Sequence, residues 1–313
     1  MMAKRALVLG GGGVTGVAWE IGVLAGLAEH GLDLAAADLI VGTSAGSVVG
    51  AGVAAGEDLA EMYAGQLAPP DGQSRARLGA GNTARLVWVM VGTRDPVRAR
   101  VKMGRLALSA KTEPEAVRRA VFESLLAGRE WPARLKVTAV DAQSGAFTVF
   151  DAGGSVTLLD AVGASCAVPG VWPPVTIAGH RYIDGGMRSA TNADLAEGYQ
   201  QVVIIAPIAQ GFGHMTSVGK QAAALAQSGA RVIVISPDKA ATQAIGRNVL
   251  DPSRRAAAAA AGRAQAAAET GRVRAIWLSG EAGASGEAGT AEVAGEPAVA
   301  DGHGVPDAAD QPG

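Results

Sequence analysis

Cysteine and histidine are scarce in this sequence of 313 residues. One cysteine, Cys166, cannot form a disulfide within the chain, so a reducing, cytoplasmic compartment is expected. No histidine lies near the cysteine or another histidine at the spacing of metal ligands, and a zinc site is therefore not expected. The four histidines are His30, His180, His214 and His303.

The sequence also lacks a long apolar run and an excess of charge of one sign. No stretch of about 18 uninterrupted apolar residues occurs, so no membrane-spanning helix is predicted. Lys and Arg number 27 against 29 Asp and Glu, and the net charge of -2 gives no electrostatic basis for binding nucleic acid or an anionic membrane surface. With 49% hydrophobic residues, the chain has the length for one large α/β domain or two smaller ones.

Residues 5–55 have the pattern of a strand–helix–strand–helix unit. A strand over 5–9 leads into a glycine loop, Gly10 to Gly16, and apolar residues at helical spacing predict a helix over 17–29. A second strand over 38–41 leads through a glycine turn into a helix over 45–55. Such a unit places two parallel strands side by side, with both glycine turns at their carboxyl ends, where open α/β sheets bind ligands.

Ser44 lies at the centre of a Gly-x-Ser-x-Gly turn, Gly42 to Gly46. A serine on such a sharp strand-to-helix bend is presented to substrate beside the positive end of the helix dipole, as a nucleophile requires. The pentapeptide alone is equally compatible with an ordinary turn whose serine caps the helix.

The glycine loop has two interpretations. Gly11-x-Gly13-x-x-Gly16 matches the dinucleotide-binding fingerprint and lies between a predicted strand and a predicted helix. That fingerprint also requires an acidic residue at the end of the second strand, where this chain has Gly42-Thr43-Ser44, while Asp38 precedes the strand. In the other interpretation, backbone N–H groups of the loop stabilise the oxyanion that forms when Ser44 attacks an ester.

The second half of the chain predicts further strands and one prominent aspartate. Hairpins are expected over 135–150 and 175–183, and the second hairpin leads directly into Asp184-Gly185-Gly186. Asp184 on its own is equally compatible with a turn residue. Buried parallel strands are expected over 201–206 and 231–235, and helices over 158–165, 218–227 and 251–274.

The middle of the chain, 57–134, is predicted to be mostly helical. An apolar patch around Trp88 is expected to belong to the core, with a lid or an acyl-chain wall as the alternative. A helix over 114–127 is expected to direct four apolar side chains inward: Val117, Val121, Leu125 and Leu126.

Three motifs occur in the order found in the patatin-like phospholipase family, which the sequence resembles over roughly residues 4–278. The resemblance implies a three-layer α/β/α fold with a mainly parallel central sheet. It also implies hydrolysis of lipid acyl esters by a dyad of Ser44 and Asp184, with Gly11, Gly12 and Gly13 binding the oxyanion and with no metal or cofactor. The motifs are Gly11-Gly12-Gly13-Val14-Thr15-Gly16, Gly42-Thr43-Ser44-Ala45-Gly46 and Asp184-Gly185-Gly186, and the stretch Ala164-Ser165, Pro169, Pro173-Pro174 is also similar to the family.

One residue departs from the pattern of the family. Its glycine loop commonly carries Arg or Lys where this chain has Thr15, so a fixed positive charge is missing at that place. The implied partners are a lipid or acyl ester and, transiently, a membrane surface, with no nucleic acid. Residues 1–278 are expected to form the catalytic domain, with 57–134 as a helical lid or insertion. Residues 279–313, rich in Gly, Ala and Glu without apolar periodicity, are expected to be disordered.

Three alternatives stay open. The first is a Ser-Asp-His triad, because His214 comes after Asp184 as in α/β-hydrolases; against it, Ser44 follows only the second strand. His180 would lie about 13 Å from Asp184 along a strand, too far to relay a proton. The second is a catalytically silent lipid-binding or scaffold protein of the same fold. The third, with less support, is a dinucleotide-binding Rossmann protein.

Overall fold

A computed structural model describes residues 3–69, 93, 95–126, 128–210 and 215–278. Its centre is an eight-stranded sheet with the order β5-β6-β3-β2-β1-β7-β8, and β4 pairs with β3 outside this path. Neighbours from β3 to β8 are parallel, whereas β4, β5 and β6 join through antiparallel pairings, so the sheet is mainly parallel as expected. The strands are β1 (Arg5–Leu9), β2 (Leu39–Gly42), β3 (Leu135–Asp141), β4 (Phe147–Phe150), β5 (Val175–Ile177), β6 (His180–Asp184), β7 (Gln201–Ile205) and β8 (Arg231–Ile235).

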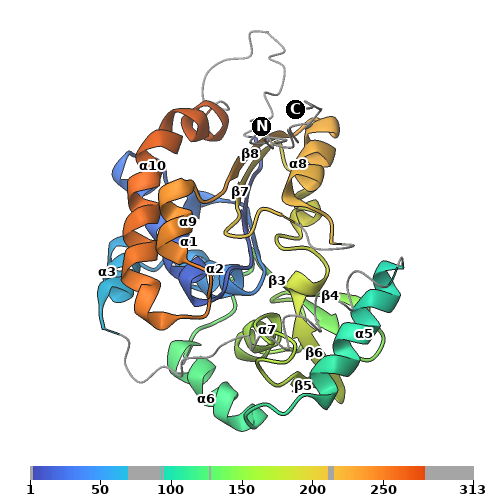
Figure 1. Cartoon of the computed structure of the whole chain (residues 1–313). Coiled ribbons are helices and arrows are strands. Elements are labelled where there is room, and N and C mark those ends of the chain that lie inside the picture. Colours follow the sequence, from blue (N-terminus) through green and yellow to red (C-terminus); the bar gives the residue numbers. More distant parts are fainter. Residues whose placement is uncertain (1–2, 70–92, 94, 127, 211–214, 279–313) are drawn as a thin grey trace, which may run out of the picture.

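Helices cover both faces of the sheet. In Figure 1, α1, α9 and α10 lie on one side of β7 and β8, and α8 lies on the other. The α-helices are α1 (Gly13–Glu29), α2 (Ala45–Ala55), α3 (Leu59–Leu67), α5 (Pro96–Ser109), α6 (Glu115–Leu126), α7 (Leu158–Ser165), α8 (Val218–Gln227), α9 (Lys239–Ile245) and α10 (Arg255–Trp277). Short 3₁₀ helices span Leu34–Ala36, Gly185–Met187, Ala193–Ala196 and Pro252–Arg254.

The alternating side chains of β1 explain why the chain forms three layers. Leu7 and Leu9 pack in the core shared with α1 and α10, whereas Ala6 and Val8 pack in a second core with Val218 of α8. A strand buried on both faces has a continuous apolar sequence, as residues 6–9 have. The three-layer α/β/α architecture expected from the sequence is confirmed.

Glycine allows α1 and α10 to pack with their backbones close together. A Cβ atom at Gly22 would lie 2.1 Å from the carbonyl oxygen of Ala259, and one at Gly262 would lie 2.3 Å from that of Trp19. Any larger side chain at either position would separate the two helices. The alanine-rich helix expected over 251–274 is therefore seated tightly on the helix that follows the glycine loop.

The helix after β1 begins earlier than its apolar spacing predicts. Gly12 is the N-cap residue of α1 and Gly13, at φ 61°, is the first residue, whereas the expected start was residue 17. The spacing missed this turn because its glycines carry no side chain with a preference for one face. The last glycines of the run thus belong to a helix N-terminus.

Both predicted hairpins are confirmed, as β3–β4 and β5–β6. The inward face predicted for α6 is wrong for three of its four residues, because Val117, Val121 and Leu125 are 51%, 40% and 44% exposed. Leu126 is buried together with Phe122. The buried face is displaced because Arg118, one turn before Phe122, packs its guanidinium over the Trp172 ring at 3.9 Å.

Within 57–134 the structure describes α3, α5 and α6, as expected of a helical region. The Trp88 patch, His214 and the tail 279–313 lie outside the described residues. In the parts of the chain that are described, no helix combines the length and apolarity that crossing a bilayer requires.

Candidate active site

Strand register brings Ser44 and Asp184 together. Gly42, the last residue of β2, pairs with Val137 of β3, and Asp184, the last residue of β6, pairs with Ala139 of the same strand. β4 pairs with β3 at positions that overlap those of both β2 and β6, so it must occupy the other edge of β3. β2 and β6 therefore lie end to end along one edge. The two strands run toward each other, so the turn after β2 meets the end of β6.

The backbone of Ser44 is strained. Its φ of 52° and ψ of -115° lie in a region that residues with a side chain rarely adopt. Ser44 is the N-cap residue of α2, but its side chain makes no capping hydrogen bond. The interpretation of this serine as an ordinary helix cap is therefore wrong, and the hydroxyl is free to act elsewhere.

Glycine is required on both sides of this serine. A Cβ atom at Gly42 would lie 2.6 Å from Cα of Ser47, and one at Gly46 would lie 2.2 Å from the carbonyl oxygen of Leu9. The sharp bend thus depends on the two flanking glycines of the motif.

The end of α7 holds the Ser44 backbone. The N–H of Ser44 donates to Oγ of Ser165 at 2.8 Å, and Ser165 is fully buried. Sγ of Cys166 donates to the carbonyl oxygen of Ser44 at 3.3 Å. Burial, and next the negative charge of Asp184, raise the pKa of the Cys166 thiol to about 12, which keeps it neutral and unreactive. The sequence contained Ala164-Ser165 as part of the resemblance, but nothing in it assigned Ser165 this contact.

Asp184 is buried, with 3% of its surface exposed. Its Oδ1 accepts a hydrogen bond from the N–H of Gly186 at 2.7 Å. Burial raises the pKa of the carboxyl group to about 6, although hydrogen bonds from the Ser44 hydroxyl and the Gly186 amide act in the opposite direction. The carboxylate is consequently ionised at neutral pH and more basic than a free aspartate.

The glycine loop runs beside Ser44. A Cβ atom at Gly11 would lie 3.5 Å from Cβ of Ser44. The N–H of Gly11 donates to the carbonyl oxygen of Ala190 at 2.7 Å, so this amide is already occupied. Among the described residues, nothing accepts a hydrogen bond from the N–H of Gly12 or Gly13, at the start of α1. Of the three glycines predicted to bind an oxyanion, two thus have a free donor.

A buried acid supports this loop. Oε1 of Glu20 accepts from the N–H of Gly10 at 2.9 Å, and Glu20 is fully buried. Burial raises the pKa of this carboxyl well above its usual range and favours the protonated form. Sequence reasoning did not assign Glu20 a role, because its contact with Gly10 forms only when α1 packs against the loop.

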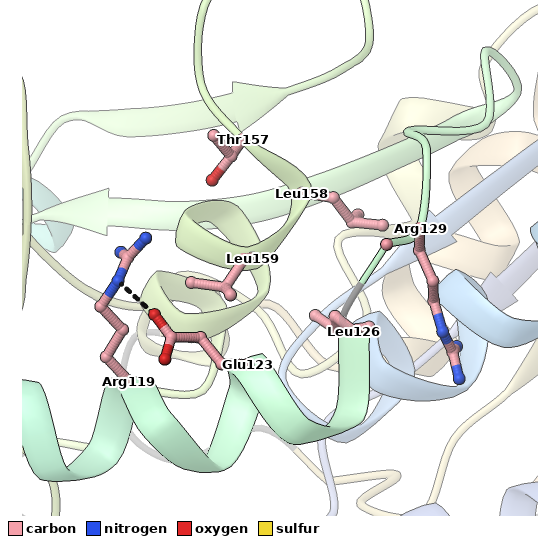
Figure 2. A pocket seen from close by; sticks show the side chains of 8 residues that line it. Arg119, Glu123, Leu126, Arg129, Thr157, Leu158 and Leu159 are labelled. Carbon is pink, nitrogen blue, oxygen red and sulfur yellow. Dashed lines mark hydrogen bonds and ion pairs between the residues drawn. The ribbon is translucent and has the colours of Figure 1, made fainter.

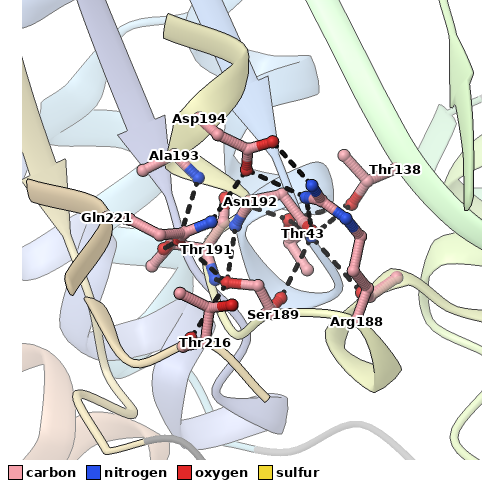
Figure 3. A network of polar contacts seen from close by, with 11 residues as sticks. Thr43, Thr138, Arg188, Ser189, Thr191, Asn192, Ala193, Asp194, Thr216 and Gln221 are labelled. Carbon is pink, nitrogen blue, oxygen red and sulfur yellow. Dashed lines mark hydrogen bonds and ion pairs between the residues drawn. The ribbon is translucent and has the colours of Figure 1, made fainter. Parts of the chain in front are cut away.

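A buried polar network ties the serine turn to the turn after Asp184 (Figure 3). Nδ2 of Asn192 donates to Oγ1 of Thr43 at 3.1 Å and to the carbonyl oxygen of Gly185 at 3.3 Å. Arg188 donates to Oδ1 of Asn192 at 2.9 Å and forms a two-point ion pair with Asp194. Sequence reasoning missed this network, although an Asn and an Asp shortly after Asp-Gly-Gly were a signal for it.

The described histidines lie away from the dyad. Nδ1 of His180 is 3.1 Å from Oδ2 of Asp141, and the imidazole is 62% exposed. Nδ1 of His30 lies 2.7 Å from the carbonyl oxygen of Gly26. Neither imidazole contacts Ser44 or Asp184.

A cavity of about 290 Å³ lies between α6 and the start of α7 (Figure 2). Both cations in its lining are already paired. Arg119 forms ion pairs with Glu123 and Asp160, and Arg129 forms one with Glu57. The lining includes neither Ser44 nor Asp184, so this cavity is separate from the candidate active site.

Comparison with known proteins found two similar structures and one matching family. The chain is similar to VipD from Legionella pneumophila, with 15% sequence identity, a TM-score of 0.44 and coverage of 87% of this chain and 67% of VipD. It is also similar to the type III effector protein ExoU, with 15% identity, a TM-score of 0.39 and coverage of 87% of this chain and 53% of ExoU, about half of that chain. Residues 7–197, well over half of the chain, match the family model described as patatin-like phospholipase, and the protein therefore belongs to the patatin-like phospholipase family.

Proposed function

We propose that the protein is a serine acyl hydrolase that cleaves carboxylic ester bonds of lipids through a dyad of Ser44 and Asp184. Membership of the patatin-like phospholipase family supports lipid acyl hydrolysis in general terms. The observation that carries the proposal is the meeting of a strained, non-capping serine with a buried aspartate at one edge of β3.

In the proposed acylation step, these groups act together on the ester. Oγ of Ser44 attacks the ester carbonyl while Asp184 accepts the hydroxyl proton. The N–H groups of Gly12 and Gly13, with the positive end of the α1 dipole, stabilise the oxyanion. Asp184 then gives the proton to the leaving alcohol, which leaves the acyl group on Ser44.

Deacylation uses the same groups, with water in place of the Ser44 hydroxyl as the nucleophile. Asp184 accepts a proton from water, and the resulting hydroxide attacks the acyl carbonyl. The tetrahedral intermediate collapses, the fatty acid leaves, and Asp184 returns the proton to Oγ of Ser44. One water molecule is consumed for each ester cleaved.

Asp184 is a suitable base because of its surroundings. A free aspartate titrates near about 3.9, whereas burial raises the pKa of Asp184 to about 6. The carboxylate is thereby more basic than that of a free aspartate, yet it remains ionised at neutral pH.

Substitution of the serine tests the proposal. Ser44→Ala should abolish hydrolysis of a short-chain nitrophenyl ester and labelling by a fluorophosphonate, because loss of a nucleophile costs several powers of ten in rate. Ser124→Ala, on the exposed side of α6, is the matched control and should behave as the parent. Turnover and labelling that persist in Ser44→Ala would overturn the assignment. A parent protein that binds lipid vesicles but hydrolyses no ester would favour the silent lipid-binding alternative.

A further inference from the structure

Exposed large apolar side chains gather on two consecutive helices. In the described part of the chain there are six such residues, and five of them lie on α5 and α6, each between 40% and 51% exposed. Single exposed apolar side chains are ordinary, but a group on adjoining helices marks an interaction surface. The five are Val97 and Leu108 on α5 and Val117, Val121 and Leu125 on α6.

The three residues on α6 form one line. They are spaced four residues apart, so they lie above one another on the same side of the helix. The core is contacted by a different line, which contains Phe122 and Leu126. The helix therefore has two apolar lines, one buried and one open to solvent.

The charge of α5 is of one sign. Arg98, Arg100, Lys102 and Arg105 lie within it, and no acidic residue does. Arg98 is 3.8 Å from Asp95, the N-cap residue, and its side chain is 82% exposed, so this pairing is loose. Arg100 and Lys102 donate to a carbonyl and a hydroxyl oxygen, and neither of these acceptors carries a charge. The net charge of -2 for the whole chain conceals this local excess of positive charge.

Helix α5 packs against β6, the strand that carries Asp184. Met103 and Ala107 of α5 pack against Ile183, the neighbour of Asp184, and Val140. In Figure 1, α5 and α6 form the lower rim of the molecule, beside β5, β6 and α7. The residue of β6 that α5 contacts is thus the chain neighbour of Asp184, with its side chain on the other face of the strand.

We propose that α5 and α6 form the surface by which the protein docks on an anionic phospholipid bilayer. The exposed apolar residues enter the boundary between headgroups and acyl chains, and Arg98, Lys102 and Arg105 contact the anionic headgroups. On α5, the exposed Val97 and Leu108 share one helix with four cations, and this combination fits such a surface better than it fits a neutral protein partner. The proposal rests on the proposed function only in that both take a lipid as the partner.

Vesicle binding tests the docking surface. The probe is vesicles of phosphatidylglycerol and phosphatidylcholine in equal parts, compared with phosphatidylcholine alone, and Ser44→Ala protein prevents their digestion during sedimentation. We expect at least tenfold tighter binding to the anionic vesicles, weakened by salt. Val117→Ser/Val121→Ser/Leu125→Ser and Arg98→Gln/Lys102→Gln/Arg105→Gln should each lower this binding at least tenfold.

Two matched controls lie elsewhere on the chain. Leu67→Ser removes the sixth exposed apolar residue, on α3, and Lys220→Gln/Lys239→Gln/Arg247→Gln removes three exposed cations outside α5 and α6. Both should bind vesicles as the parent does. Triple variants of α5 and α6 that are folded and bind as tightly as their parent would overturn the proposal. So would a parent that dimerises through these residues and binds no vesicles, because the occupant would then be a second copy.

A second readout separates this proposal from the proposed function. With Ser44 intact, the two triple variants should hydrolyse a soluble nitrophenyl ester at the parental rate and lose at least tenfold in hydrolysis of vesicle phospholipid. A parent that hydrolyses no ester but binds vesicles through these residues would remove the proposed function and leave the docking surface. An equal loss of hydrolysis rate on both substrates would contradict the proposed docking surface.

Discussion

Asn192 donates a hydrogen bond to Thr43 across 149 positions of sequence, over 3.1 Å. Thr43 precedes Ser44, and the same amide group of Asn192 also donates to Gly185, which follows Asp184. One buried side chain thus connects the residues adjoining both members of the proposed dyad. Asn192 lies in the left-handed region, at φ 51°, where asparagine is better tolerated than most residues.

Replacing Asn192 should disturb both stability and turnover. Asn192→Ala removes one of the hydrogen bonds that reach the buried oxygens of Thr43 and Gly185, so we expect a loss of about 1–3 kcal/mol in the free energy of unfolding. We also expect kcat to fall at least tenfold through misplacement of Ser44 relative to Asp184. Urea unfolding and steady-state kinetics measure the two effects. Asn192→Gly relieves the backbone strain and should lose as much activity; parental kcat in either variant would contradict the positioning role.

Turnover should depend on the ionisation of Asp184. Its carboxyl must be deprotonated to accept the Ser44 proton, and burial raises its pKa to about 6. The rate should therefore rise from pH 5 to pH 7 and then stay level to pH 9. A rate that is flat from pH 5 upward would mean that the base titrates at the value of a free aspartate.

The pH profile alone does not separate a dyad from a triad, because a histidine titrates near about 6.5. Histidine variants do so. His180→Ala should keep most activity because its ring lies beside Asp141 and is mostly exposed, and His214→Ala should keep most activity as well. Asp184→Asn should lose nearly all of it. If His214→Ala is as inactive as Asp184→Asn, the site is a triad.

The raised pKa of Asp184 also predicts a cost in stability. The folded protein holds this proton more tightly than the unfolded chain, so stability falls as the pH rises from about 4 through 6, and the deficit persists at neutral pH. Asp184→Asn carries no such charge. Its stability relative to the parent should be greater at pH 8 than at pH 4, by on the order of 2 kcal/mol. Chemical unfolding at the two pH values measures this difference, and a difference independent of pH would contradict it.

The glycine loop can be tested by crowding. A Cβ atom at Gly12 would lie 2.4 Å from Cβ of Pro207, so Gly12→Val must displace the loop and its free N–H. We expect kcat to fall by two to three powers of ten, on the order of 3–4 kcal/mol of lost oxyanion stabilisation. Gly65→Ala in α3, where a Cβ meets nothing within 4 Å, is the control. A folded Gly12→Val protein with parental kcat would remove the loop from the mechanism.

The local parts of this fold could be predicted from sequence. The unit from β1 to α2 is coded by apolar strands, glycine turns and helical spacing that all lie within about fifty residues. The same is true of the hairpin that ends at Asp184, because turn residues and alternation are local signals.

Contacts between distant segments could not be predicted in this way. The line of α6 that is buried depends on Arg118 stacking on Trp172, 54 positions later, and helical spacing alone does not distinguish the two apolar lines. The contact of Ser165 with Ser44 and that of Glu20 with Gly10 depend on how finished helices pack. In the sequence, Ser165 and Glu20 stand out only as polar residues among apolar ones. A single polar residue does not show which distant residue it contacts.

Strands β2 and β6 each pair with the same edge of β3, and this arrangement has a consequence for how the sequence of such a protein can change during evolution. The separation of Ser44 and Asp184 is set by two neighbouring pairing positions on a single strand, Val137 and Ala139. The chain between α2 and β3 contains α3, α5 and α6. It contributes no strand to the sheet and so does not set this separation. Insertions or deletions there can alter which surface or lipid the protein meets while the reacting groups keep their geometry, so substrate preference and bond-breaking chemistry are free to diverge separately.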